Sequence, residues 1–165
     1  MSAVMEERRG RVLVLTMNDP ATRNALGPAT YQSGTALLAA ARDDAGIGAV
    51  VLTGAAGVFC SGGNLNRLAR MRGEPMEVAG KGIEGLHGLV RAIRGCGKPV
   101  IAAVEGAAAG AGFSLALACD LIVAARDARF VLAYVKVGLS PDGGATAFLA
   151  QALPRQLAAE IAMEG

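Results

Sequence analysis

Short apolar runs rich in Val, Leu and Ile alternate with segments of helical character, and this alternation constrains the fold more than any other feature. The runs at 11–17, 49–53 and 98–104 predict strands, because turn-forming residues bound them. Apolar residues at 3.6-residue spacing predict a helix at 76–94, and another is expected at 28–44. The remaining predicted elements are a small-residue helix ending near 118, strands at 121–124 and 129–133, and helices at 145–152 and 155–165. Such a series is typical of an α/β fold with mostly parallel pairing.

The core expected inside this fold is built from small side chains. The sequence holds 34 Ala and 23 Gly, together 57 of 165 residues, whereas aromatic residues make up only 4% and Trp is absent. Close approach between backbones must therefore fill much of the interior. The strand at 49–53 is continuously apolar rather than alternating, so we expect both of its faces to be buried. No linker, repeat or low-complexity tract divides the chain, which predicts one domain over 1–165.

Charge and composition exclude several classes of function. A net charge of +2 and few aromatic residues argue against nucleic acid as a partner. The apolar stretch at 106–119 is too short to span a membrane, and the charged segment 1–11 does not resemble a signal peptide. Three cysteines and one histidine form no zinc-ligand set, and free thiols suit a reducing cytosol. We therefore expect a soluble cytoplasmic protein without a metal.

Two glycine-rich segments share one layout, in which a buried strand leads into a turn of small residues. Gly62-Gly63 follows the strand at 49–53, and Gly110-Ala111-Gly112 follows the strand at 98–104. Such turns leave backbone N–H groups unpaired, and two of them that converge form an oxyanion hole. Tight packing of strand on helix is the alternative. Dinucleotide binding is disfavoured, because the third glycine of a G-x-G-x-x-G motif is missing.

Four motifs make the interpretation specific. The segment 50–65 (VVLTGAAGVFCSGGNL) resembles the first signature of the enoyl-CoA hydratase/isomerase (crotonase) family. The segment 98–112 (KPVIAAVEGAAAGAG), continued by 119–125 (CDLIVAA), resembles the second signature. The segment 18–26 (NDPATRNAL) resembles the region after the family's first strand, and 137–145 (VGLSPDGGA) resembles its later active-site loop. The motifs occur in the family's order over nearly the whole chain.

The resemblance implies a fold, a substrate and a set of residues. The fold is a spiral of strand–strand–helix units, an α/β architecture whose C-terminal helical part is missing here. Gly63 and Ala111 are the expected oxyanion-hole donors for the carbonyl of an acyl-CoA thioester, and coenzyme A is part of the substrate rather than a cofactor. Residues expected to contact the substrate are Arg23, Ala25, Gly63, Asn64, Leu65, Asn66, Ala111, Ser114 and Tyr134. A homotrimer or a dimer of trimers is the expected assembly.

Departures from the family pattern bear on the reaction. Hydratases of this family use two glutamates, and the matching positions here carry Ser114 and Tyr134. Adding water to a double bond needs a base and an acid, so their absence disfavours hydration. Asp142 remains, in a loop position where some isomerases of the family carry an Asp. One carboxylate suffices to move a proton between two carbons, although local sequence alone favours a turn or helix-cap role for Asp142.

Other side chains fit catalysis less well. Ser114 as a nucleophile needs a histidine base, and the one histidine, His87, borders an apolar helix face and is interpreted as a surface residue. Tyr134 is expected to pack or donate a hydrogen bond in the acyl pocket, and nothing basic beside Cys60 indicates an activated thiol. The sequence thus predicts an enoyl-CoA isomerase with Asp142 as the catalytic carboxylate. A hydratase, a dehalogenase-like use of Asp142 as nucleophile, and a non-catalytic CoA-ester-binding paralogue remain alternatives.

Overall fold

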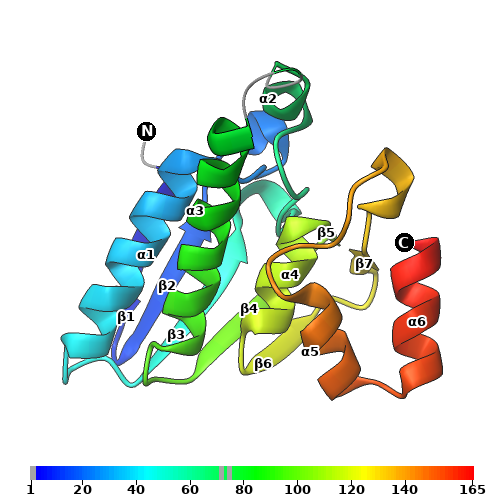
Figure 1. Ribbon diagram of the computed structural model, residues 1–165. Helices are drawn as coiled ribbons and strands as arrows, with labels where there is room; N and C mark the ends of the chain where they lie inside the picture. The colour runs from blue at the N-terminus through cyan, green and yellow to red at the C-terminus, as the bar shows by residue number, and fades with distance from the viewer. Residues whose placement is uncertain (1–2, 71–72, 74–75) are drawn as a thin grey trace.

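The computed structural model describes residues 3–70, 73 and 76–165, and its described strands form one large and one small sheet (Figure 1). The large sheet has the order β1-β2-β3-β4-β6, and the small sheet pairs β5 with β7. β1 is antiparallel to β2, and every other described pair is parallel. The strands are β1 (Val4–Arg9), β2 (Val12–Met17), β3 (Ala49–Gly54), β4 (Val100–Val104), β5 (Ala107–Ala109), β6 (Leu121–Ala124) and β7 (Arg129–Val131).

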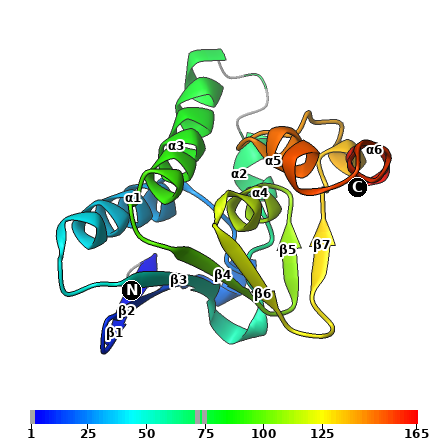
Figure 2. The ribbon, with the colours of Figure 1, turned by 90° about the horizontal axis from the view of Figure 1, so that it is seen from below.

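The helices form a layer on one side of the large sheet. Figure 2 shows α1, α3 and α4 along one face of that sheet, with α5 and α6 beyond them on the side of β7. The helices are α1 (Pro28–Asp43), α2 (Leu65–Arg70), α3 (Met76–Arg94), α4 (Ala111–Ala118), α5 (Ala145–Ala152) and α6 (Arg155–Glu164). Short 3-10 turns lie at η1 (Pro20–Thr22), η2 (Ala55–Gly57) and η3 (Val135–Val137). Among the described residues, no helix combines the length and apolar character needed to cross a bilayer.

The predicted alternation of strands and helices is confirmed, and three further elements appear. β1 was not predicted because its residues are mostly charged and exposed; it is held by backbone pairing with β2. β5 lies in a segment expected to be a glycine-rich turn, and α2 begins at Leu65, where the first expected glycine-rich loop ends. The expectation that both faces of β3 are buried was wrong, since Val50 and Leu52 are buried while the alternate residues are only half-buried. One face of β3 is therefore less enclosed than its apolar sequence indicates.

Two strand–strand–helix turns make the expected spiral visible. β4, β5 and α4 follow one another, and β6, β7 and α5 repeat the arrangement. In each turn the first strand joins the large sheet and the second joins the small sheet. Cys60, after β3, forms a bridge with Ala108 of β5, so the preceding turn of the spiral also contributes to the small sheet. This topology sets the loops after β3 and β4 next to each other.

Small residues allow α1 and α3 to pack closely, as the composition predicts. A Cβ atom at Gly34 of α1 would lie 2.9 Å from a methyl carbon of Leu89, and one at Gly85 of α3 would lie 2.6 Å from the ring of Tyr31. Real Cβ atoms do not approach neighbours so closely, because protein interiors are already packed at crystal density. Glycine at these two positions therefore lets the helices that cover the sheet approach closely, and the ring at Gly85 leaves less room for adjustment than the Leu89 methyl at Gly34.

Candidate active site

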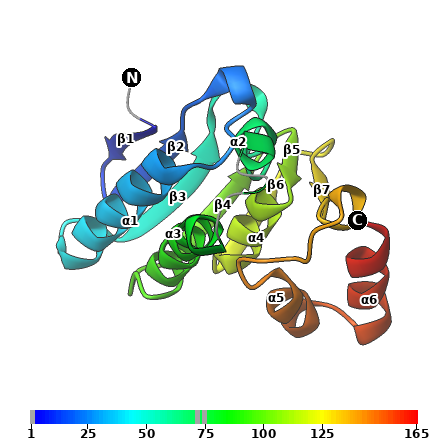
Figure 3. The same ribbon diagram turned by 45° about the horizontal axis from the view of Figure 1, so that its top comes forward.

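The two glycine-rich loops meet at the end of the molecule where β3 and β4 finish, close to α2 (Figures 1 and 3). A Cβ atom at Gly62 would lie 2.7 Å from the carbonyl oxygen of Ala109, and one at Gly112 would lie 2.6 Å from that of Cys60. The Cys60 N–H donates to Ala107 at 2.9 Å, and the Ala109 N–H donates to Cys60 at 2.9 Å. The loops are thus joined backbone to backbone, which explains why small residues are needed here.

Two predicted donors lie in these joined loops. The backbone N–H groups of Gly63 and Ala111 donate to no acceptor in the part of the chain that the structure describes. Ala111 is the first residue of α4, so its N–H also carries the partial positive charge of a helix N-terminus. Free N–H groups on adjoining loops can both donate to one carbonyl oxygen that gains negative charge.

The segment that contains Arg23 and Ala25 runs beside the first loop. The Ser61 N–H donates to the Arg23 carbonyl at 3.0 Å, and the Leu26 N–H donates to that of Gly62 at 2.7 Å. The side chain of Arg23 is exposed, and Ala25 is half-buried. A phosphate group of a nucleotide-bearing substrate can reach the guanidinium from solvent.

Asn24 holds this segment in place, a role that sequence reasoning missed. Its side chain is only 1% exposed. Its Nδ2 donates to the carbonyls of Ala55 and Val58 at 2.9 and 2.6 Å, and its Oδ1 accepts from the Asp19 N–H at 2.9 Å. Asn24 adopts a left-handed conformation with φ 58°, which Asn tolerates better than most residues. The buried amide therefore links the 18–26 segment to the loop after β3.

Asn64 immediately precedes α2, and Leu65 and Asn66 are the first two residues of that helix. The Oδ1 of Asn64 accepts from the Arg67 N–H at 3.0 Å, so this side chain caps the helix. Leu65 is 61% exposed, and Asn66 is exposed as well. An apolar side chain this exposed at the rim of the two loops can cover part of a bound molecule.

Asp142, Tyr134 and Ser114, which lie far apart in the sequence, form one hydrogen-bonded cluster. The Tyr134 hydroxyl donates to Oδ1 of Asp142 at 2.5 Å and lies 3.1 Å from Oγ of Ser114. Oγ of Ser114 donates to the Asp142 backbone carbonyl at 3.0 Å. A Cβ atom at Gly143, where φ is +60°, would lie 2.9 Å from the Ser114 side chain. Gly143 thus lets the Asp142 loop approach α4, whose first residue is Ala111.

Burial and hydrogen bonding set the protonation of this cluster. Tyr134 is 7% exposed, and burial together with the hydrogen bond to Asp142 raises the pKa of its hydroxyl well above the ordinary value. The phenol therefore stays protonated and donates at physiological pH. Asp142 itself is half-buried, and its Oδ2 has no hydrogen-bond donor among the described residues. One carboxylate oxygen is held by the protein, and the other is free.

A second tyrosine, absent from the sequence-based predictions, lies within electrostatic reach of Asp142. Tyr31 is 9% exposed, and burial raises its pKa to about 12, with a smaller contribution from the negative charge of Asp142. The positive charge of Arg67 acts in the opposite direction. Tyr31 lies within α1, and nothing in the local sequence of this helix indicates that its hydroxyl is close to Asp142.

The residues set aside as catalytic groups from sequence have other surroundings. Burial raises the pKa of the Cys60 thiol to about 12, so the thiolate is scarce at neutral pH. His87 lies 3.6 Å from Glu84 on α3, and it is not among the hydrogen-bond partners of Ser114 in the described chain. Within the described residues, no three His, Cys, Asp or Glu side chains gather closely enough to hold a metal ion.

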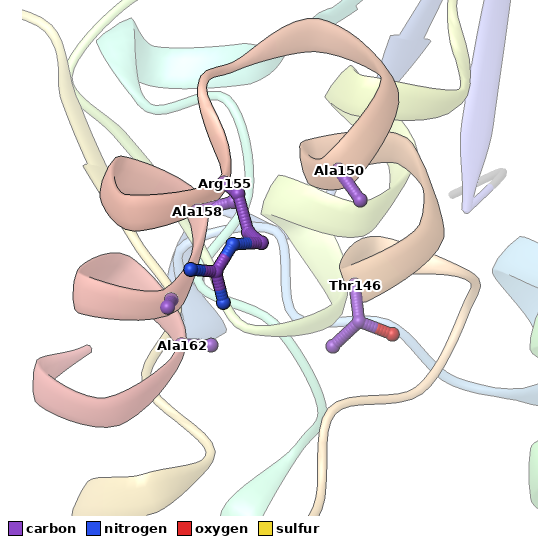
Figure 4. A pocket seen from close by; sticks show the side chains of 6 residues that line it. Thr146, Ala150, Arg155, Ala158 and Ala162 are labelled. Carbon is purple, nitrogen blue, oxygen red and sulfur yellow. The ribbon is translucent and has the colours of Figure 1, made fainter.

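A hollow between α5 and α6 lies apart from this cluster (Figure 4). Its lining is Thr146, Ala150, Arg155, Ala158, Ala159 and Ala162, which include none of the predicted site residues. Methyl groups dominate the surface, and Arg155 supplies the charge. The chemistry-bearing residues are instead gathered at the joined loops and α4.

Comparison with known proteins agrees with the motifs and the spiral. The family model described as enoyl-CoA hydratase/isomerase matches residues 7–165. The chain belongs to this family. Its fold agrees as well: a crystal structure of an enoyl-CoA hydratase from Polaromonas sp. JS666 is 55% identical, with a TM-score of 0.96 over 98% of this chain and 63% of that one.

Curated members of the family carry two kinds of name. The chain is 38% identical to a 2,3-dehydroadipyl-CoA hydratase of Escherichia coli, over 100% of this chain and 63% of that protein. It is also 38% identical to a 1,2-epoxyphenylacetyl-CoA isomerase of Escherichia coli, again over 100% of this chain and 63% of the relative. The chain therefore spans slightly less than two thirds of these relatives' length, and hydratases and isomerases are both represented among them.

Proposed function

We propose that the chain forms the catalytic core of an enoyl-CoA isomerase, which shifts the double bond of an acyl-CoA thioester. The observation that carries the proposal is the position of Asp142, whose carboxylate has one oxygen hydrogen-bonded to Tyr134 and the other without a donor among the described residues. A general base must be held in place and must have an open oxygen, and both conditions are met here. The adjoining free N–H groups of Gly63 and Ala111 supply the complementary donors.

The proposed reaction moves one proton between two carbons of the acyl chain. In a 3-enoyl-CoA, Oδ2 of Asp142 takes a proton from C2, and the electron pair of that C–H bond forms an enolate. The N–H groups of Gly63 and Ala111 donate to the enolate oxygen and stabilise its charge. Asp142 then returns the proton to C4, the carbonyl re-forms, and the double bond lies between C2 and C3. Atoms and electrons balance without any other reactant.

The remaining site residues are proposed to bind the coenzyme A part of the substrate. Arg23 and Ala25 would lie along the pantetheine and a phosphate, and Asn64, Leu65 and Asn66 would border the thioester end. The exposed guanidinium of Arg23 and the exposed side chain of Leu65 support this assignment. The assembly we propose is a homotrimer or a dimer of such trimers.

Hydration is the second candidate, because one of the 38% identical relatives is named a hydratase. Water addition across C2 and C3 needs a base for water and an acid for C2. The positions that match the hydratase glutamates carry Ser114 and Tyr134, and Tyr134 is held protonated, which makes it a poor base. Asp142 alone would have to serve both steps, so isomerisation is favoured.

Substrate pairs separate these functions. The 165-residue chain is incubated with a 3-enoyl-CoA and, separately, with a 2-enoyl-CoA, and the products are resolved by chromatography. Interconversion of the two enoyl isomers supports the isomerase, and a 3-hydroxyacyl-CoA product supports the hydratase. Binding of both thioesters without any turnover would contradict the proposed catalysis and favour a non-catalytic CoA-ester-binding protein.

A further inference from the structure

Tyr134 forms the direct link to the Asp142 side chain, and this link does not belong to the substrate-binding role expected from sequence. Its hydroxyl lies 2.5 Å from Oδ1 of Asp142, so the phenol proton points at the carboxylate. A hydroxyl that donates to Asp142 has no second proton to offer a substrate. The contact therefore concerns the geometry of the carboxylate.

The rest of the cluster fixes both partners of this hydrogen bond. Ser114 is fully buried, lies 3.1 Å from the Tyr134 hydroxyl, and donates to the backbone carbonyl of Asp142 at 3.0 Å. Ser114 also lies in the first turn of α4, and its N–H donates to Gly110 at 3.1 Å, beside the free N–H of Ala111. The Asp142 backbone is thus fixed relative to the oxyanion donor, while its carboxylate orientation depends on Tyr134.

We infer that Tyr134 is a positioning residue that holds Oδ1 of Asp142, so that only Oδ2 exchanges a proton with the substrate. This inference rests on the proposed isomerase function. Without the phenol, the carboxyl group can turn about its Cβ–Cγ bond, and either oxygen can bind water. A proton taken from C2 then has a route to solvent before it reaches C4. With the phenol in place, the proton stays on Oδ2 and returns to the same substrate molecule.

Isotope transfer measures directly whether the proton taken from C2 returns to C4 of the same substrate molecule. A 3-enoyl-CoA with deuterium at C2 is converted by the wild-type chain, and the fraction of deuterium found at C4 of the product is measured by mass spectrometry. In Tyr134→Phe, we expect that fraction to fall, kcat to fall about 10-fold to 10²-fold, and KM to stay within a few-fold. A purely structural role would lower the folded fraction without changing the deuterium fraction per turnover.

Tyr31→Phe is the matched control. It removes a second buried phenol hydroxyl that makes no hydrogen bond to Asp142. Its deuterium transfer is expected to equal that of the wild type. Equal deuterium transfer in wild type and Tyr134→Phe would overturn the inference, whether or not kcat changes. Absence of isomerisation by the wild type would instead refute the proposed function, so the two failures are distinct.

A second experiment does not depend on the folding of Tyr134→Phe. The chain contains two tyrosines, so in a Tyr31→Phe background fluorotyrosine replaces Tyr134 alone. Fluorine lowers the pKa of a phenol, and a deprotonated phenol can no longer donate to Asp142. Asp142 is the ionisable group that faces the Tyr134 hydroxyl, and its other neighbour, Ser114, carries no charge. The nearby cation Lys136 has its side chain against Gly165. In the fluorinated chain, the alkaline limb of the pH–activity profile should therefore move to lower pH than in the unfluorinated Tyr31→Phe chain. An alkaline limb at the same pH in both chains would overturn the inference.

Discussion

Gly62→Ala tests whether the two joined loops need their backbone contact. The change affects stability in two ways, because Gly62 has φ +96° and its Cβ position lies 2.7 Å from the Ala109 carbonyl oxygen. A left-handed backbone costs a residue with a Cβ roughly 1–2 kcal/mol. Overpacking adds about 1–3 kcal/mol, because the displaced neighbour is backbone and cannot rotate away. The free energy of unfolding should fall by roughly 2–5 kcal/mol in total.

Gly57→Ala is the control for backbone strain alone. Gly57 has φ +71°, but no atom of another described residue, its chain neighbours aside, lies within 4 Å of its Cβ position. It should lose only roughly 1–2 kcal/mol of stability, with turnover per folded molecule unchanged. In Gly62→Ala the displaced loop also shifts Gly63 relative to Ala111, and a shift of about 1 Å costs roughly 10²-fold in rate. Thermal unfolding and isomerase turnover are measured on both variants, and equal values in the two would refute the reasoning.

Three further predictions follow from the described contacts. Ala111→Pro removes one free N–H at the first position of α4, where proline is well tolerated, so the fold should persist while kcat falls by roughly 10²–10³-fold in an isomerase assay. The Cys60 thiol, with its pKa raised to about 12, should resist alkylation at pH 8 in the folded chain and react in denaturant. Mass spectrometry of labelled peptides measures both reactions, and rapid labelling of Cys60 in the folded chain would contradict its burial. Tyr31 has a folded-state pKa raised from 10.0 to about 12, so its contribution to stability is present below pH 10 and is lost as pH rises to about 12. Denaturant titrations at alkaline pH should show a smaller loss of stability in Tyr31→Phe than in the wild type. An identical pH dependence of stability in the two chains would contradict the raised pKa.

The sequence was sufficient for elements with strong local patterns. β2 is an apolar run between turn-forming residues, α1 begins at Pro28, and α3 carries apolar periodicity; their boundaries lie within two residues of the predictions. β1 and β5 could not be predicted in this way, because backbone pairing with a distant or neighbouring strand, rather than side-chain pattern, holds them. Tertiary pairing overrides weak local propensity in such segments.

In the candidate site too, residues in recognisable motifs could be predicted, whereas links between residues distant in the sequence could not. Gly63, Ala111 and Asp142 were identified from motifs that resemble a family, and the structure brings their loops onto adjoining elements. The side-chain link from Tyr134 to Asp142 was not predictable, because the seven residues between them form only the short turn η3 and irregular chain, with no periodic pattern. The support given by Asn24 was missed for a similar reason, since the two carbonyls to which its side chain donates lie more than 30 residues away.

Asp142→Asn gives the most direct test of the proposed proton transfer. Asn keeps an Oδ1 that accepts from the Tyr134 hydroxyl at this position, but it replaces the free Oδ2 with an amide that takes up no proton. We expect kcat for conversion of a 3-enoyl-CoA to a 2-enoyl-CoA to fall by at least about 10²-fold, the contribution of a general base, while the melting temperature changes little. Turnover equal to that of the wild type in a folded Asp142→Asn chain would contradict the account.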